Sequence, residues 1–292
     1  MTSLILDRIE IEDSGANPVR LAVAIHRQLG ARPGPVPIYE IARALDIFEI
    51  REEYLDNCEA ALITRPERSY GSMLLNLHSS PQRRRYSVGH ELLHFLNAWH
   101  EPTVAHGFQC SREDMIETDA SASDRHRRQE AEANEFAIEL LAPSARMRPY
   151  IETPADLKHA LAMARDLDIS REAAARRFVA LHDEPLAVVF VNNGQLRYAE
   201  PGAEFPRLSI AKGQPVPFLP KRIGAGALSE MEEVDAIDWL QRPDGVCLSA
   251  QMFRQREGYA TVLLKAELSD AADSELEDTY QRFTRAEPRR DA

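Results

Sequence analysis

Residues 87–100 read SVGHELLHFLNAWH, and this stretch decides how the rest of the chain is interpreted. His90 and His94 are four positions apart, so on a helix both side chains project from one face, about one turn apart. Two imidazoles placed in this way can bind one ion at Zn–N distances of roughly 2.0 to 2.1 Å. Apolar residues surround the pair and predict a largely buried helix: Leu92, Leu93, Phe95 and Leu96. Buried neighbouring histidines need a partner, and a metal ion is the natural one.

Glu91, the residue that follows the first histidine, adds a candidate base to this metal site. Zinc lowers the pKa of a bound water towards 7, and a neighbouring carboxylate can remove its proton and later pass it to a leaving amine. This is the HExxH arrangement of metallopeptidases. We therefore predict that His90 and His94 bind a metal ion and that Glu91 is the catalytic residue.

The helix that carries the motif is expected to begin at Ser87, because serine is a good capping residue and the basic loop SPQRRR precedes it. The apolar pattern continues to about Trp99 without a clear break. A helix of that length would carry His100 past the site. We therefore expect that replacing His100 leaves metal binding nearly unchanged.

Two residues are candidates for the third metal ligand. His100 stands where the pattern HExxHxxGxxH has its third histidine, with Asn97 in the position of the glycine. Glu130 is the alternative, because it extends the apolar stripe of a predicted helix from about residue 129 to 142, together with Asn134. A carboxylate aligned with a buried face must meet a cation or hydrogen-bond donors. The residues alone leave both candidates open. The other glutamates of this helix are expected to face solvent: Glu132, Glu135 and Glu139.

Paired motifs in the sequence resemble the ImmA/IrrE family of metallopeptidases. The resemblance rests on RRYSVGHELLHF and EAEANEFAIELLAP, with the strand GSMLLNL and the early segment PVPIYEIARALDI, and it covers about residues 15–182. It implies a zincin-like domain that binds zinc, or Mn²⁺ or another divalent ion in the cell, through His90, His94 and Glu130. It also implies that Glu91 is the base. Asn134, which shares the buried stripe with Glu130, is expected to contact the metal ligands without binding the ion itself.

The resemblance further suggests how a peptide substrate binds. If residues 71–77 form a sheet edge near the site, an extended substrate can add to that edge by β-augmentation, along Ser72, Leu74 and Asn76. The long polar connection from residue 100 to 129, with His100, His106 and His126, can form a cover over the cleft.

Composition limits the classes of function. The 292 residues include 35 Lys plus Arg and 47 Asp plus Glu, and the net charge of −12 argues against a general nucleic-acid binder. The cysteines are widely spaced, which favours ordinary reduced thiols over a disulfide framework or a thiolate zinc finger: Cys58, Cys110 and Cys247. No run of about 18 apolar residues occurs, so we expect a cytoplasmic protein without a membrane span.

Local patterns predict an α+β fold. Helices are expected over residues 17–30 and 35–47, followed by a hairpin of strands at 60–64 and 71–77. After residue 182 the pattern becomes alternating, with one hairpin around the turn Asn193-Gly194 and a second strand pair in VCLSAQMFRQREGYATVLLKAEL.

These patterns predict four segments along the chain. Residues 1–143 form the zinc metallopeptidase domain, and residues 144–182 form a helix-turn-helix-like extension. Residues 183–268 form a small β-rich α+β domain suited to sensing or docking, and residues 269–292 form a partly disordered tail.

The leading functional hypothesis is a zinc endopeptidase of narrow specificity. Members of the family it resembles cleave helix-turn-helix repressors, which implies a repressor as protein partner and derepression of stress-response or mobile-element genes as the outcome. The alternative is a DNA-binding regulator that uses the helix pair at residues 155–182, with Arg171, Arg176 and Arg177. Residues 144–184 contain seven basic and seven acidic residues, and this balance argues against direct nucleic-acid binding.

Overall fold

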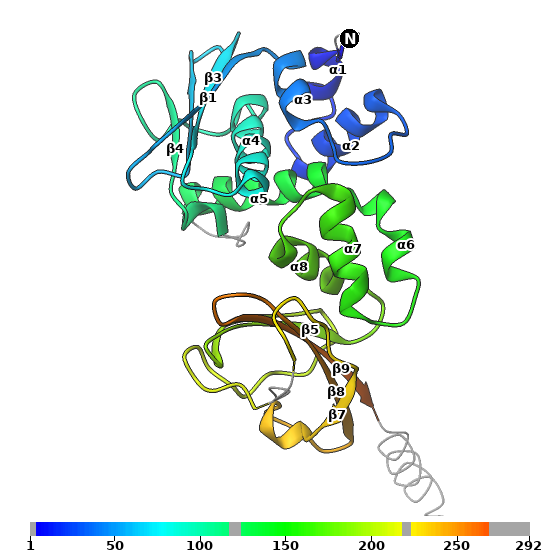
Figure 1. Cartoon of the computed structure of the whole chain (residues 1–292). Coiled ribbons are helices and arrows are strands. Elements are labelled where there is room, and N and C mark those ends of the chain that lie inside the picture. Colours follow the sequence, from blue (N-terminus) through cyan, green and yellow to red (C-terminus); the bar gives the residue numbers. More distant parts are fainter. Residues whose placement is uncertain (1–3, 117–123, 218–222, 269–292) are drawn as a thin grey trace, which may run out of the picture. The chain divides into compact units, whose positions relative to one another are not determined.

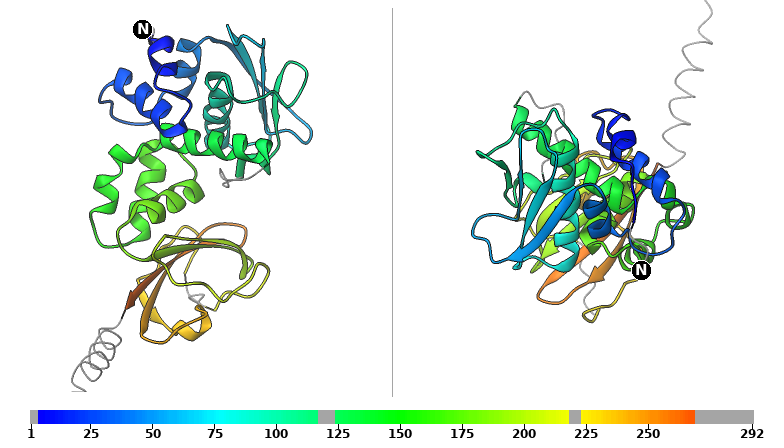
Figure 2. Two further views of the ribbon diagram at one scale, coloured as in Figure 1. Left: turned by 180° about the vertical axis from the view of Figure 1, so that it is seen from behind. Right: turned by 90° about the horizontal axis from the view of Figure 1, so that it is seen from above.

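Figures 1 and 2 show the computed structural model of the chain, which describes residues 4–116, 124–217 and 223–268. The predicted tail at residues 269–292 lies outside the described residues. The α+β fold predicted from the sequence is confirmed, because helices are combined with two separate sheets. None of the helices in the described part of the chain combines the length and hydrophobicity needed to cross a lipid bilayer.

The chain divides into two compact units. The first comprises residues 1–148 and 162–174, and the second comprises residues 149–161 and 175–292. The two helices of the predicted helix-turn-helix-like extension therefore contribute residues to both units. The domain borders expected at residues 143 and 182 stay a prediction.

The first unit contains a helical N-terminal part, a four-stranded sheet and two long helices that carry the predicted site. Its elements are α1 (Arg8–Glu12), α2 (Pro18–Leu29), α3 (Ile38–Ala44), β1 (Ile47–Glu53), β2 (Ala60–Thr64), β3 (Gly71–Asn76), α4 (Pro81–Leu96), β4 (Gly107–Cys110), η1 (Asp114–Ile116), α5 (Arg125–Leu141) and η2 (Ser144–Arg146). Asn17 caps α2 through the Arg20 N–H, and Gly30 ends it at φ 67°. This helix therefore has the predicted bounds.

The strand order in the sheet of the first unit is β1-β3-β2-β4. Strands β2 and β3 form the predicted antiparallel hairpin, and β1 pairs in parallel with the other side of β3. The prediction that residues 71–77 form a sheet edge is therefore wrong, because Ser72 and Leu74 have strand partners on both sides and Asn76 pairs with β1. The edge strands are β1 and β4.

Strand β1 was not predicted, because its sequence lacks the alternation of a half-buried strand. In IFEIREE only Ile47 is fully buried, and the last three residues are exposed. Asp46 at φ 68° separates the strand from α3, which ends at Ala44 instead of residue 47. The predicted order of two helices and two strands therefore lacked this strand as well as the short α1.

Helix α4 begins at Pro81, more than one turn before the predicted start. Ser80 is the cap, since its side chain accepts the Arg83 N–H at 3.2 Å, and proline suits the first turn. The predicted basic loop is thus helical, and its arginines have acidic neighbours: Arg83 with Glu59, Arg84 with Glu52 and Arg85 with Asp168. Ser87 lies inside the helix, where its hydroxyl donates to the Arg83 carbonyl.

Helix α4 packs against β2 and β3 on one side and against α3 and α5 on the other, as Figure 1 shows. Gly89 permits the close approach of α5. A Cβ at this position would lie 3.3 Å from the Cα and Cβ of Ala137. The absence of a side chain next to His90 therefore brings the two site-bearing helices together.

The second unit is built on a five-stranded antiparallel sheet with strand order β6-β5-β9-β8-β7. The helices and strands after η2 are α6 (Arg148–Ile151), α7 (Leu157–Leu167), α8 (Arg171–Leu181), β5 (Leu186–Asn192), β6 (Gln195–Pro201), β7 (Glu232–Val234), η3 (Ala236–Asp238), β8 (Val246–Arg254) and β9 (Tyr259–Leu268). Both predicted strand pairs and both predicted helices are present. Asn193 and Gly194 have φ values of 49° and 78°, as a two-residue hairpin turn requires.

Candidate metal centre

Three predicted site residues meet in the buried space between α4 and α5. His90 and His94 place their Nε2 atoms 3.2 Å apart. From α5, Glu130 places Oε2 3.0 Å from Nε2 of His90 and Oε1 3.5 Å from Nε2 of His94. All three side chains are buried. The geometry thus brings together the ligand set that the resemblance implied.

Cys110 is a fourth donor group that the sequence analysis did not place in the site. It ends β4, and its Sγ lies 3.8 Å from Nε2 of His94. Each of four residues offers one ligand atom, and these atoms all lie within 4.8 Å of one another: His90, His94, Cys110 and Glu130. The sequence does contain a signal for this strand, because Phe108 and Cys110 alternate with a polar residue in GFQC. The sequence analysis interpreted the whole connection from residue 100 to 129 as irregular and so missed it.

His90 is oriented by a hydrogen-bond network on α5. Its Nδ1 lies 2.9 Å from Oδ1 of Asn134, which also accepts from the Tyr86 hydroxyl. The Asn134 amide group donates to the backbone carbonyl of Asp114 at 2.9 Å, which fixes the direction of Oδ1. His90 therefore donates from Nδ1, which leaves Nε2 for a cation; Nε2 itself lies against Oε2 of Glu130. This is the supporting position that the sequence analysis assigned to Asn134.

His94 is oriented by His100, which does not lie where the sequence predicted. Helix α4 ends at Leu96 and Asn97 adopts an extended conformation, so the chain turns back. His100 is buried, with Nδ1 2.8 Å from Nδ1 of His94 and Nε2 3.0 Å from a carboxylate oxygen of Glu132. The expectation that His100 passes the site is wrong because the helix stops one turn early.

The carboxylate of Glu132 fixes the proton positions in this chain. Because a carboxylate only accepts, His100 donates to it from Nε2 and accepts at Nδ1 the proton of His94. Nε2 of His94 is then free to bind a cation. Of the glutamates that were expected to face solvent, Glu135 is exposed, Glu132 is half-buried, and Glu139 is buried and caps Ser144.

Burial and the contacts of Glu130 with His90 and His94 together set the protonation of the site. Burial lowers the pKa of His94 to about 3, so this imidazole is neutral at physiological pH. Burial raises the pKa of Glu91 to about 7 against the attraction of His90. Burial opposes ionisation of Glu130 as well, but its contacts with His90 and His94 outweigh this and lower its pKa. Burial opposes protonation of His90, but the same contact with Glu130 raises the pKa of this histidine. Burial raises the pKa of Cys110, and the charge of Glu91 adds to that shift.

A buried oxygen atom in the site indicates that its protein partners are incomplete. Oε1 of Glu130 makes no hydrogen bond to the described residues, with Nε2 of His94 and Nδ1 of His126 each 3.5 Å away, and the fully buried carboxyl group of Glu91 interacts with the Cys110 thiol. A carboxylate oxygen is costly to bury without a partner. Imidazole nitrogens, a carboxylate and, once its proton is lost, a cysteine thiolate are ligands that zinc accepts. The donor set and the unsatisfied oxygen of Glu130 therefore fit a divalent metal ion.

The remaining histidines of the connection differ in their relation to the site. His126, in the first turn of α5, lies 3.5 Å from Oε1 of Glu130 and 3.1 Å from Asp114, and it is about half exposed. His106 is exposed, and its backbone carbonyl accepts a hydrogen bond from the Thr64 N–H. The predicted cover includes residues 117–123, which lie outside the described residues.

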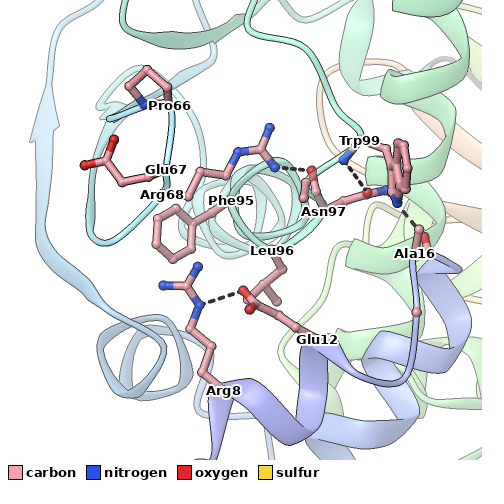
Figure 3. A pocket seen from close by; sticks show the side chains of 12 residues that line it. Arg8, Glu12, Ala16, Pro66, Glu67, Arg68, Phe95, Leu96, Asn97 and Trp99 are labelled. Atoms are coloured by element: carbon pink, nitrogen blue, oxygen red, sulfur yellow. Dashed lines mark hydrogen bonds and ion pairs between the residues drawn. The ribbon is translucent and has the colours of Figure 1, made fainter.

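A cavity of about 390 Å³ lies at the C-terminal end of α4. Figure 3 shows Arg68 reaching across this end of the helix to the backbone of Asn97, and its guanidinium also donates to the backbone carbonyl of His100. Trp99, which lines the same cavity, is 80% exposed. Arg68 therefore holds the turn that returns His100 to the site.

Comparisons with known proteins agree with the geometry. Residues 55–179 match the family model of the IrrE N-terminal-like domain of peptidase family M78. No curated protein matches the chain. A solved structure described as a Mycobacterium tuberculosis transcriptional regulator aligns over 91% of this chain and 83% of that chain, with a TM-score of 0.51 and 14% sequence identity. At this identity the alignment indicates a shared fold alone.

Proposed function

We propose, from the IrrE N-terminal-like domain at residues 55–179 and the metal centre inside it, that the chain is a zinc-dependent endopeptidase of narrow specificity. The observation that carries this proposal is the buried set of His90, His94 and Glu130 with Glu91 beside it. A domain that only folds has no need to gather two histidines and two glutamates at one fully buried point, because burying charged groups together costs free energy.

The proposed roles follow from the contacts of each residue. His90, His94 and Glu130 hold the ion, which when bound acidifies water and polarises the scissile carbonyl group. Glu91 accepts a proton at a carboxylate oxygen and delivers it to the leaving amine. A pKa of about 7 suits an acid–base group that must both take and give a proton near neutral pH. Asn134 and His100 hold the two imidazoles in the tautomers that leave both Nε2 atoms towards the ion.

We expect an extended substrate to pair with the edge strand β4. Strand β3 cannot receive it, because β3 is an inner strand with partners on both sides. Strand β4 is a sheet edge whose last residue, Cys110, is part of the donor set. The Gln109 N–H donates to the Thr103 hydroxyl at 2.9 Å, and a substrate carbonyl could replace that hydroxyl.

The proposed substrate is a helix-turn-helix repressor in the cytoplasm, whose cleavage would switch on stress-response or mobile-element genes. The resemblance of the paired motifs to the ImmA/IrrE family supports this substrate class, and the match to the IrrE N-terminal-like domain supports a metallopeptidase of that type. The DNA-binding alternative receives less support. Arg176, one of the three arginines on which it rests, pairs with Glu200 at 3.3 Å.

The test is incubation of the purified protein with a candidate repressor encoded beside it and, in parallel, with casein. We expect one or two cuts in the repressor, loss of its DNA binding, and little digestion of casein, with all cleavage stopped by a chelator. The matched control is Glu91→Gln, which keeps the proposed ligands. Indiscriminate casein digestion would contradict narrow specificity, and an intact repressor with salt-sensitive DNA binding by this protein would favour the regulator instead.

A further inference from the structure

We infer that Cys110 is a fourth protein donor to the metal ion, which makes the resting centre a closed His, His, Glu, Cys site. The inference rests on the proposed function, because it concerns the same ion. It adds a residue that the HExxH motif and the glutamate do not include, and it limits the proposed peptidase to the fraction of molecules in which the thiolate has left the ion.

Two of the separations between donor atoms fit a tetrahedral ion, and all the donor atoms lie within 4.8 Å of one another. With bonds of about 2.0 to 2.1 Å for nitrogen and about 2.3 Å for sulfur, tetrahedral geometry gives about 3.3 Å between two nitrogens and about 3.6 Å between nitrogen and sulfur. His90 and His94 place their Nε2 atoms 3.2 Å apart, and Cys110 places Sγ 3.8 Å from Nε2 of His94. These two distances match the tetrahedral values to within a few tenths of an ångström.

The backbone of Cys110 is fixed by the sheet. Cys110 is the register partner of Ala60 on β2, and its carbonyl accepts the Glu59 N–H at 2.9 Å. Two residues earlier on the same face of β4, Phe108 stacks on the ring of His94 with centroids 4.5 Å apart. The strand therefore presents its thiol and its aromatic ring to the same histidine, and only rotation about the Cα–Cβ bond is needed to adjust Sγ.

An independent observation indicates that a cation belongs among these donors. Glu130 is buried, and its Oε1 makes no hydrogen bond to the described residues although Nε2 of His94 and Nδ1 of His126 lie 3.5 Å away, so this oxygen faces nitrogen atoms without a proton between them. A divalent ion bound by one carboxylate and one thiolate gives a centre with no net charge. A neutral centre costs less to bury than the singly positive centre formed with Glu130 alone.

A fourth protein donor has a consequence for function. Catalytic zinc sites keep one position for water or substrate, whereas structural sites are closed by four protein ligands. With Cys110 bound, no position of a tetrahedral ion is left for a small oxygen ligand. The thiolate must leave and take up a proton before such a ligand can bind.

X-ray absorption at the zinc edge of the unmodified protein tests the inference directly. We expect one sulfur scatterer at about 2.3 Å together with nitrogen and oxygen scatterers at about 2.0 to 2.2 Å. Cys110→Ala should lose the sulfur while it still binds zinc, and Cys58→Ala, which removes a neighbouring thiol outside the donor set, should keep it.

The closed state is tested with cobalt in place of zinc and acetohydroxamate as the added ligand. The Cys110→Ala protein should bind acetohydroxamate more tightly than the unmodified protein, and should lack the thiolate-to-cobalt charge-transfer band. Equal affinity would overturn the closed state. Zinc bound by nitrogen and oxygen alone would overturn the inference and leave the proposed function standing, whereas a protein that binds no zinc would overturn both.

Discussion

The two units of the chain treat buried polar groups in different ways. In the described part of the second unit, the buried polar side chains are Gln251 and Thr261, and both have hydrogen-bond partners. Two further buried oxygen atoms there lie singly: Oε2 of Glu184 pairs with Lys265 at 2.7 Å, and Oδ1 of Asn192 makes no hydrogen bond to the described residues. The first unit buries two histidines and two glutamates around one point, where one carboxylate oxygen of Glu130 lacks a hydrogen bond to the described residues: His90, His94, Glu91 and Glu130.

This difference distinguishes residues buried to stabilise the fold from residues buried to bind a ligand. The core of the second unit consists of apolar side chains on one face of its sheet together with Trp239, which is enough to stabilise a small β-rich domain. The first unit has an apolar core as well, so it does not need a buried charged cluster to fold. A cluster that costs free energy in the absence of a ligand indicates a binding site.

The largest expected effect is the loss of metal binding in His94→Ala. This change removes a nitrogen donor from the centre of the set, and metal content measured on the purified protein should fall to background, with peptidase activity lost at the same time. Glu130→Ala should behave similarly. His106→Ala is the control, because His106 is exposed and outside the donor set. Full metal occupancy of His94→Ala would contradict the proposed centre.

A core substitution in the second unit should lower stability and leave metal binding unchanged. Trp239→Ala should lower the free energy of unfolding of that unit by about 3 to 5 kcal/mol, because the indole is 1% exposed in its apolar core. Hydrogen exchange should show loss of protection in β5 and β9, while zinc content stays unchanged. Ile237→Ala, at a neighbouring position that is 66% exposed, should have a much smaller effect. Loss of zinc in Trp239→Ala would mean that the metal centre depends on the second unit.

Next in size is the effect of Glu91→Gln. The variant should keep its metal, because Glu91 is not among the proposed ligands, while cleavage slows by at least about 10²-fold, the scale for loss of a general base. Single-turnover cleavage and metal analysis on the same preparation measure both quantities. Retained cleavage would remove Glu91 from the mechanism.

The sequence predicted the parts of the first unit that depend on local periodicity. The spacing of His90 and His94, the capping of α2 by Asn17 and the apolar stripe that contains Glu130 are properties of single helices, and the structure has them. In the second unit, the Asn193-Gly194 turn and the alternating strands are equally local signals.

Features that depend on pairing between distant segments were not predictable in this way. Strand β1 is defined by its parallel pairing with β3, and this pairing turns the predicted edge into an inner strand. Cys110 reaches the site because β4 pairs with β2, and His100 returns to it because Arg68, from the loop between β2 and β3, binds the turn after α4. Each of these contacts joins segments whose sequences carry no mutual signal.

The smallest effect we predict concerns His100, where sequence and structure give different expectations. The sequence predicted no change in metal binding on replacement of His100. The structure shows it bonded to Nδ1 of His94 and, through its other nitrogen, to Glu132. Removal of a partner that orients a ligand weakens metal binding by about 10- to 100-fold. We therefore expect His100→Ala to lower zinc affinity by this factor.

Glu132→Gln sharpens this prediction because it tests the direction of the hydrogen bonds. The amide oxygen of glutamine can still accept the His100 proton but carries no charge, so the loss of affinity should be smaller than in His100→Ala. Trp99→Ala is the control, since Trp99 adjoins His100 in sequence and is 80% exposed. Competition titrations with a chromophoric chelator measure all three variants. If His100→Ala binds zinc as tightly as Trp99→Ala, then His94 is held in place by the Phe108 ring and helix packing, and the histidine pair is not needed to orient it.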